Sequence, residues 1–188
     1  MPDRVDIVWD VETGDPDDFL TLLLLLGHPR VRLKAVTVTP GTPHQVGVVR
    51  WTLDRMGRDL PVGAFNLAHD KQCVSGWHHR VFGDMPPSED ARPGWEVLAE
   101  HCDEDTTLVT GAPLKNLGTL LSRPDLDSWR LGRWVAQGGF AGEGVVPAEL
   151  QLDKFKGLDA VQTYNFNGAP KAAAAALADD RIGARWLV

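Results

Sequence analysis

The stretch Asp10-Val11-Glu12-Thr13-Gly14-Asp15-Pro16-Asp17-Asp18 decides how the fold is interpreted. It places five carboxylates within nine residues, between an apolar run at 5–9 and another at 19–26. Such carboxylates repel one another at neutral pH, and a bound cation would neutralise them; their hard oxygens suit Ca²⁺ or Mg²⁺. The alternative is a solvated acidic turn in which Asp and Pro begin a helix. We favour a cation site because open α/β sheets bind ligands at the carboxyl ends of their strands.

Outward from this acidic turn, strand-like and helix-like segments alternate along the chain. We expect strands at 5–9, 33–39, 60–65, 106–110, 133–137, 162–167 and 184–188, and helices at 15–26, 43–56, 95–102, 114–121 and 170–178. This order predicts an α/β protein with an open, mostly parallel, Rossmann-like sheet and helices on both faces. The 188 residues suit a single domain, 1–188.

Residues 66–94 show no clear period and contain Trp77, His78 and His79. A stretch of this length without regular structure is commonly functional, so an active-site flap is one interpretation. A surface excursion with scattered polar residues is the other. On the first interpretation, Trp77 and the histidines of this stretch could face the site.

Composition excludes several classes of function. The net charge is -7 and no basic stripe is present, which argues against nucleic-acid binding. Cys73 and Cys102 are too few for a disulfide framework, and reduced thiols are typical of the cytosol. The start of the chain lacks a signal-like pattern, and its apolar runs are too short for a membrane span. We therefore expect a cytoplasmic protein without a membrane partner.

Polar or glycine-rich turns follow four of the expected strands. They are the acidic turn and the segments 39–42, 111–116 and 165–167. Because the carboxyl ends of parallel strands share one edge of a sheet, these turns should converge on one crevice.

Taken in order, these turns resemble those of the inosine/uridine-preferring nucleoside hydrolases. That family has an Asp-x-Asp-x-Gly-x-Asp-Asp turn, a Gly-Pro-Leu-Thr-Asn turn, a Met-Gly-Gly strand end and a Glu-Phe-Asn segment. The matching residues here are Asp10, Glu12, Asp17 and Asp18, then Gly111-Ala112-Pro113-Leu114-Lys115-Asn116, Gly138-Gly139 and Thr163-Tyr164-Asn165-Phe166. The resemblance covers the whole chain but only about the first three-fifths of a typical member, so the chain resembles a C-terminally truncated domain.

The resemblance implies Ca²⁺-dependent hydrolysis of the N-glycosidic bond of a ribonucleoside or nucleoside derivative, releasing base and ribose; Mg²⁺ is possible in place of Ca²⁺. The implied metal ligands are Asp10, Glu12, Asp15, Asp18 and the Lys115 carbonyl. Glu12, with Asp10 beside it, would be the catalytic base, and His79 or His78 could protonate the leaving base. The implied substrate-binding residues are Asp17, Asn165, Asn167 and Trp77. We also expect a homo-oligomer.

Several departures from the family pattern leave alternatives open. Glu12 replaces an Asp, and the turn has one extra residue, so Asp15 could replace Asp17 as a ligand. The family's late Asp ligand is absent. Either the chain is a fragment, or a second chain completes the site, or activity has been lost. The alternative functions are therefore a degraded hydrolase-like domain that binds a nucleoside or partner chain without turnover, and a Mg²⁺-dependent phosphatase-like enzyme. The base of the nucleoside is not determined.

Overall fold

The chain folds around one β-sheet. The computed structural model describes residues 4–140, 142 and 144–188. The strands are β1 (Val5–Val11), β2 (Val31–Val38), β3 (Val62–Ala64), β4 (Arg92–Pro93), β5 (Thr106–Thr110), β6 (Leu131–Ala136) and β7 (Ile182–Leu187).

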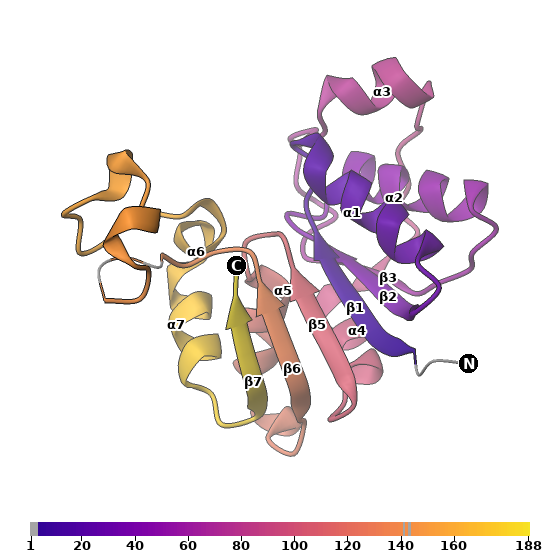
Figure 1. The fold of residues 1–188 in the computed structure, drawn as a ribbon. Helices are drawn as coiled ribbons and strands as arrows, with labels where there is room; N and C mark the ends of the chain where they lie inside the picture. Colours follow the sequence, from indigo (N-terminus) through magenta and orange to yellow (C-terminus); the bar gives the residue numbers. More distant parts are fainter. Residues whose placement is uncertain (1–3, 141, 143) are drawn as a thin grey trace.

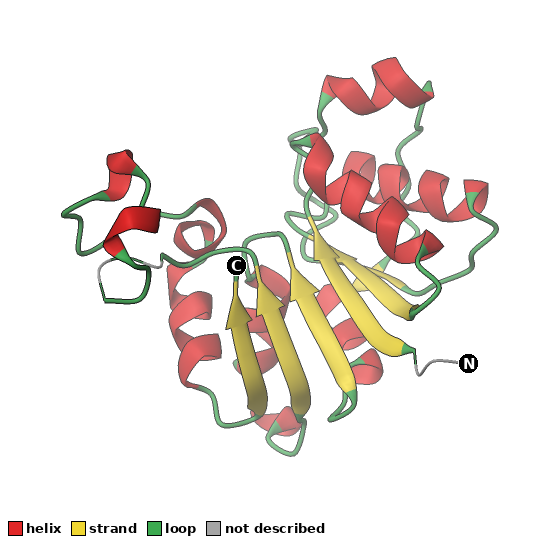
Figure 2. Cartoon of the chain, viewed as in Figure 1, coloured by secondary structure: helices red, strands yellow, loops and turns green. Residues whose placement is uncertain are grey.

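The strands form a seven-stranded sheet in the order β4-β3-β2-β1-β5-β6-β7, and every pair is parallel. The sheet twists, and its strands all point toward the same edge (Figure 1, Figure 2). The predicted parallel α/β sheet is therefore confirmed. The order reverses at β1, which lies between β2 and β5. The acidic turn leaves the carboxyl end of β1, which is the position where such sheets bind ligands.

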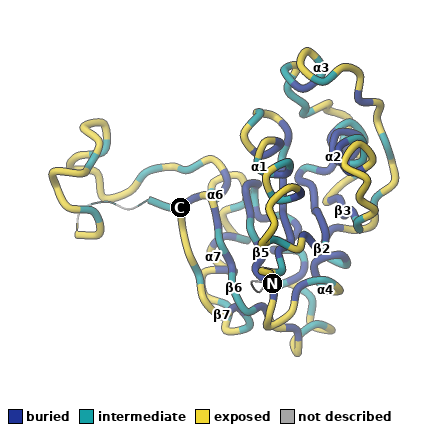
Figure 3. Tube along the Cα trace, turned by 45° about the vertical axis from the view of Figure 1, so that its right-hand side comes forward, coloured by how far each residue is buried: buried dark blue, intermediate teal, exposed yellow. Residues whose placement is uncertain are grey.

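Helices cover the two faces of the sheet unequally. They are α1 (Pro16–Gly27), α2 (Pro43–Arg55), α3 (Gly76–Phe82), α4 (Gly94–His101), α5 (Lys115–Leu121), α6 (Tyr164–Gly168) and α7 (Pro170–Ala178). Side chains of α4, α5 and α7 pack on one face in a core that includes Leu108 and Trp134. Side chains of α1 and α2 pack on the other face in a second core that includes Trp9 and Val36. The buried strands β1 and β2 separate these cores, whereas β7 is largely exposed (Figure 3).

Local sequence explains the two helices next to the crevice. Pro16 occupies the first position of α1, where a missing N–H costs nothing, and Asp17 and Asp18 lie in the first turn beside the positive end of the helix dipole. Thr42 begins α2 with a capping box, because its hydroxyl accepts from the Gln45 N–H while the Gln45 side chain accepts from the Thr42 N–H.

Two sequence-based expectations differ from the structure. Residues 66–94 contain the helix α3 and the short strand β4, which the irregular pattern did not reveal. The predicted strand at 162–167 is wrong, because residues 164–168 form α6. The Asn167 side chain accepts a hydrogen bond from the Thr163 N–H at 2.9 Å, which holds the first turn of this five-residue helix. So short a helix shows no 3.6-residue period in the sequence.

Within the part of the chain that the structure describes, none of the helices combines the length and the apolar character needed to cross a membrane.

Candidate active site

Asp10 lies at the centre of the candidate site, near the carboxyl end of β1. The parallel register places it opposite Thr37 of β2, whose hydroxyl donates to Asp10 Oδ1 at 2.6 Å. The Asn116 amide donates to the same oxygen at 2.9 Å. Asp10 is fully buried, and its Oδ2 has no hydrogen-bond partner among the described residues. Burial raises the pKa of Asp10 to about 6, and the hydrogen bonds from Thr37 and Asn116 oppose that rise.

Asp18 and Glu12 form the second part of the site. Asp18 lies in the first turn of α1, is buried, and accepts a hydrogen bond from the Glu12 N–H at 2.9 Å. Burial, together with the negative charges of Asp17, Glu12 and Asp10, raises the pKa of Asp18 to about 8. Burial also raises the pKa of Glu12, whose Oε2 accepts from the Gly14 N–H at 2.6 Å. The turn therefore holds carboxyl groups whose ionisation the fold disfavours.

This donor set suits a hard cation in its chemistry. Burial is the main cause of the raised pKa values, and a bound ion would favour the ionised carboxylates that burial disfavours. Asp10 Oδ2 offers an oxygen ligand without a partner among the described residues. The side-chain geometry is not that of a complete cage, however. In residues 4–140, 142 and 144–188, no group of three or more His, Cys, Asp or Glu residues is arranged to hold a metal ion. Asp10, Asp18 and Glu12 would supply part of a coordination shell.

Asn165 joins the neighbouring strand ends to the site. Its amide donates to the Gly111 carbonyl at 2.9 Å and to the Gln137 carbonyl at 3.1 Å, so α6 is fixed to the ends of β5 and β6. Gly111 in turn packs against Asp18. A Cβ atom at position 111 would collide with Asp18 Oδ1 and with the Trp9 ring. The acidic turn, the turn at 111–116 and the segment 165–167 therefore converge at one edge of the sheet, as predicted.

Other predicted site residues of the turns are less closely engaged. Asp15 and Asp17 are exposed. The Lys115 carbonyl accepts from the Thr119 hydroxyl within α5 at 2.8 Å, and Lys115 Nζ lies 5.5 Å from the centre of the Phe65 ring. The side chain of Asn167, in α6, accepts a hydrogen bond from the N–H of Thr163, which precedes the helix.

The helix α3 is tied to the acidic turn through Thr13. The Thr13 carbonyl accepts from the Ser75 N–H at 2.8 Å, and the Thr13 hydroxyl donates to the Cys73 carbonyl at 3.1 Å. Residues 73–75 therefore lie alongside the acidic turn, held there by hydrogen bonds to Thr13, and α3 begins directly after them. This attachment fits the interpretation of residues 66–94 as a flap.

The aromatic residues of α3 pack on Phe19 of α1. The Phe19 ring centre lies 6.3 Å from that of Trp77 and 5.0 Å from that of His78, which is fully buried. His79, the predicted acid, is turned toward Asp84, with 4.0 Å between Nδ1 and Oδ1. Trp77 thus contributes to a small apolar cluster, and His78 is the histidine buried against α1.

Thr37 and Asn116 were not assigned roles from the sequence. Asn116 is separated from Asp10 by 106 residues, and nothing local marks it as a partner of that carboxylate. Its position after Gly111-Ala112-Pro113 was the one available signal. Thr37 belongs to an apolar, β-branched strand, in which a threonine is ordinary.

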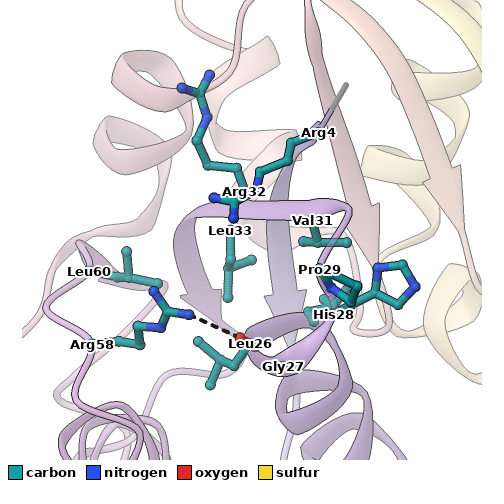
Figure 4. A pocket seen from close by; sticks show the side chains of 11 residues that line it. Arg4, Leu26, Gly27, His28, Pro29, Val31, Arg32, Leu33, Arg58 and Leu60 are labelled. Carbon is teal, nitrogen blue, oxygen red and sulfur yellow. Dashed lines mark hydrogen bonds between the residues drawn. The ribbon is translucent and has the colours of Figure 1, made fainter. Parts of the chain in front are cut away.

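A separate cavity of about 310 Å³ lies at the opposite end of β1 and β2 (Figure 4). Arg4, Arg32 and Arg58 line it, together with the end of α1. Arg58 donates to the Leu26 carbonyl at 3.3 Å and Arg32 pairs with Asp6, so two of the three cations already have partners. This basic cavity is distant from the carboxyl ends of the strands and shares no lining residue with the acidic turn.

Comparisons with curated proteins give relatives at low identity. An uncharacterised protein of Aquifex aeolicus (strain VF5) is 28% identical over 172 residues, which are 89% of this chain and 57% of that protein. The pyrimidine-specific ribonucleoside hydrolase RihA of Enterobacter sp. (strain 638) is 31% identical over 182 residues, which are 87% of this chain and 57% of that protein. The chain therefore spans a little over half the length of these relatives. No family model matches it.

Solved structures show the same fold. A plant nucleoside hydrolase superposes with a TM-score of 0.66 at 19% identity, covering 98% of this chain and 59% of that one. An inosine-uridine preferring nucleoside hydrolase from Bacillus anthracis gives 0.63 at 21% identity, covering 98% and 65%. Sequence and fold agree with the resemblance of the acidic turn. Over the part of their length that it spans, the chain is similar in sequence to ribonucleoside hydrolases and shares the fold of nucleoside hydrolases.

Proposed function

We propose that this chain carries the N-terminal part of a Ca²⁺-dependent site that hydrolyses the N-glycosidic bond of a ribonucleoside or nucleoside derivative. The observation that carries the proposal is the pairing of buried Asp10, whose Oδ2 has no partner among the described residues, with buried Asp18 in the first turn of α1. The dipole of α1 would stabilise ionised Asp18, and a cation would stabilise the ionised forms of both carboxyl groups.

The residues of the chain divide into ligands, a base and substrate contacts. Asp10, Asp18 and Glu12 would hold the cation, with Asp15 and the Lys115 carbonyl as further predicted ligands. When bound, Ca²⁺ would supply positive charge next to a water molecule and the ribose hydroxyls. Mg²⁺ is a possible replacement, since both ions take oxygen ligands.

Proton transfer would use the carboxyl groups of the turn. Thr37 and Asn116 fix Asp10 Oδ1, which leaves Oδ2 directed away from these donors and able to accept a proton from water. A pKa raised to about 6 places Asp10 near the range in which a general base works at neutral pH. Glu12 is the other candidate base. His79 is the proposed proton donor to the leaving base, with His78 as its neighbour in α3.

Substrate contacts are proposed for exposed and polar residues around the crevice. Asp17 is exposed beside Asp18 and would accept hydrogen bonds from ribose hydroxyls. Asn165 and Asn167 would contribute from α6, and Trp77 from α3. The relatives named as pyrimidine-specific make uridine and cytidine the first substrates to test. A cytoplasmic location and a homo-oligomeric state are further predictions.

The test is release of free ribose from uridine, cytidine and inosine with and without Ca²⁺, comparing the wild type with Asp10→Asn. The proposal predicts ribose release that requires Ca²⁺ and falls by at least about a hundredfold in the variant. Ribose release that survives both chelation and the Asp10→Asn change would overturn it.

A second candidate function is binding of a nucleoside without turnover. The incomplete set of metal ligands among the described residues favours it. It predicts saturable nucleoside binding in calorimetry with no ribose released at any enzyme concentration.

A further inference from the structure

A groove of about 700 Å³ lies between α5 and α7 and shares no lining residue with the acidic turn. Both helices begin at the carboxyl edge of the sheet and run back along one face of it, since each precedes a parallel strand (Figure 1). They touch where Gly118 meets Ala172, because a Cβ atom at position 118 would lie 2.4 Å from that of Ala172. We call this hollow the α5–α7 groove.

One end of the α5–α7 groove is apolar. Gly118 and Ala175 carry little or no side chain, so the two helices leave space between them, and Leu121 lines the groove about one helical turn beyond Gly118. The hydroxyls of Thr119 and Ser122 also line it, but each donates to a carbonyl of α5 at 2.8 Å. This end therefore offers apolar surface and hydroxyl groups that already have acceptors.

The other end of the groove is cationic. Lys115 and Lys171 lie in the first turns of α5 and α7, and Lys115 Nζ is 5.5 Å from the centre of the Phe65 ring, which also lines the groove. The described lining residues include no Asp or Glu, and within residues 4–140, 142 and 144–188 neither lysine forms a salt bridge. α7 has no side-chain cap, so the positive end of its dipole adds to the two side-chain charges. In a chain of net charge -7, this local excess of positive charge favours an anionic ligand.

The two ends of the groove together favour a ligand that is both anionic and apolar. An inorganic anion would contact only the cationic end, and a neutral hydrocarbon would contact only the apolar end. The groove has the volume of pockets that bury small organic ligands, which are lined mainly by apolar side chains and a few placed polar groups. A lysine ammonium is a compact charge on a flexible stem, so Lys115 and Lys171 can both reach one anionic group.

We propose that the α5–α7 groove binds a small amphipathic carboxylate, with its head between Lys115 and Lys171 and its apolar chain along Leu121 and Ala175. The inference goes beyond the proposed hydrolysis, because this binding needs neither the cation nor a nucleoside.

The test is titration of the 188-residue protein with decanoate, followed by calorimetry and by backbone amide NMR, in a buffer that contains a chelator and no nucleoside. We expect saturable binding with amide shifts concentrated at Phe65, 115–122 and 168–175. Decan-1-ol has the same chain length without the charge. It should bind at least about tenfold more weakly, which corresponds to one hydrogen bond to a charged group.

Two pairs of variants examine the two ends of the groove. Ala175→Phe fills the apolar end and should weaken decanoate binding by at least about tenfold. Ala174→Phe is its matched control, because Ala174 is exposed on the same helix and does not line the groove. Lys171→Gln should weaken binding of decanoate by about threefold to tenfold and leave binding of decan-1-ol unchanged. Lys154→Gln removes an exposed lysine outside the groove and should change neither.

Four outcomes would overturn the proposal. Decanoate causes no saturable shifts in the groove, or its shifts spread over the whole surface, or decan-1-ol binds as tightly as decanoate, or Ala175→Phe binds decanoate as tightly as Ala174→Phe. Circular dichroism checks that each variant is folded. Absence of ribose release with decanoate binding intact would contradict the proposed function and leave this inference standing.

Discussion

Asp10 shows at the scale of one residue how the fold prepares a carboxylate for chemistry. The Thr37 hydroxyl and the Asn116 amide both donate to Oδ1, and these bonds oppose the effect of burial on its pKa. Both donors stabilise the ionised form of the carboxyl group. Removing either should therefore matter most when Asp10 is charged.

Thr37→Val should raise the pKa of Asp10 above its value of about 6, because the closest donor to the carboxylate is lost. Unfolding at pH 8 should be easier by about 1.5–3 kcal/mol, the range for a hydrogen bond to a charged group, with a smaller effect at pH 5. Carboxyl NMR titration and urea unfolding measure the two quantities. Thr52→Val is the control, since that buried hydroxyl donates to a helix carbonyl. An equal effect of both changes at both pH values would refute the role of Thr37.

The acidic turn should also make stability depend on pH. The pKa values of Asp10 and Asp18 are raised from 3.8 to about 6 and about 8, so the folded protein holds protons that the unfolded chain releases. Stability from this source is full below about 3.8 and declines as pH rises to about 8. The unfolding temperature of chelator-treated protein should therefore fall across this window. A double Asp10→Asn, Asp18→Asn variant should show a flatter profile; an unchanged profile would contradict the assignment.

At the scale of elements, the alternation of strands and helices was predictable because most elements carry local signals. Pro16 after an acidic residue and the Thr42–Gln45 pair mark helix starts, and the β-branched runs mark strands. α6 and β4 carry no such signal. α6 is held by the hydrogen bonds of Asn165 to residues of other strand ends, so tertiary contacts decided its structure. The predicted positions of the carboxylates followed from topology, whereas their partners did not.

The packing of α3 on α1 depends on Phe19, which contacts Trp77, His78 and Phe82. Phe19→Ala should destabilise the protein by about 3–5 kcal/mol and open the segment 73–85 to hydrogen exchange. Leu20→Ala removes a neighbouring apolar side chain that is 49% exposed and should have little effect on either measurement. Unaltered exchange of 73–85 in Phe19→Ala would show that α3 is held by other contacts.

Gly111 joins the turn after β5 to α1. Because a Cβ atom there would collide with Asp18 and Trp9, Gly111→Ala should displace Asp18 and cost about 1–3 kcal/mol. Gly27→Ala is the matched control, since no atom lies near its would-be Cβ. Urea unfolding distinguishes the two variants. Equal stabilities for both would show that the turn tolerates a larger residue.

At the scale of the whole molecule, one parallel sheet brings the carboxyl ends of its strands to a single edge, where Asp10, Glu12 and Asp18 lie. This edge gives the chain its proposed chemistry.

Calorimetric titration of Ca²⁺ at pH 7, in two buffers with different ionisation enthalpies, tests the cation site most directly. The account predicts saturable binding of about one ion with release of about one proton, because a carboxyl group with a pKa of about 8 is mostly protonated at this pH. Asp18→Asn should abolish both the binding and the proton release. Binding that is unaltered in Asp18→Asn, or the absence of any Ca²⁺ binding by the wild type, would contradict it.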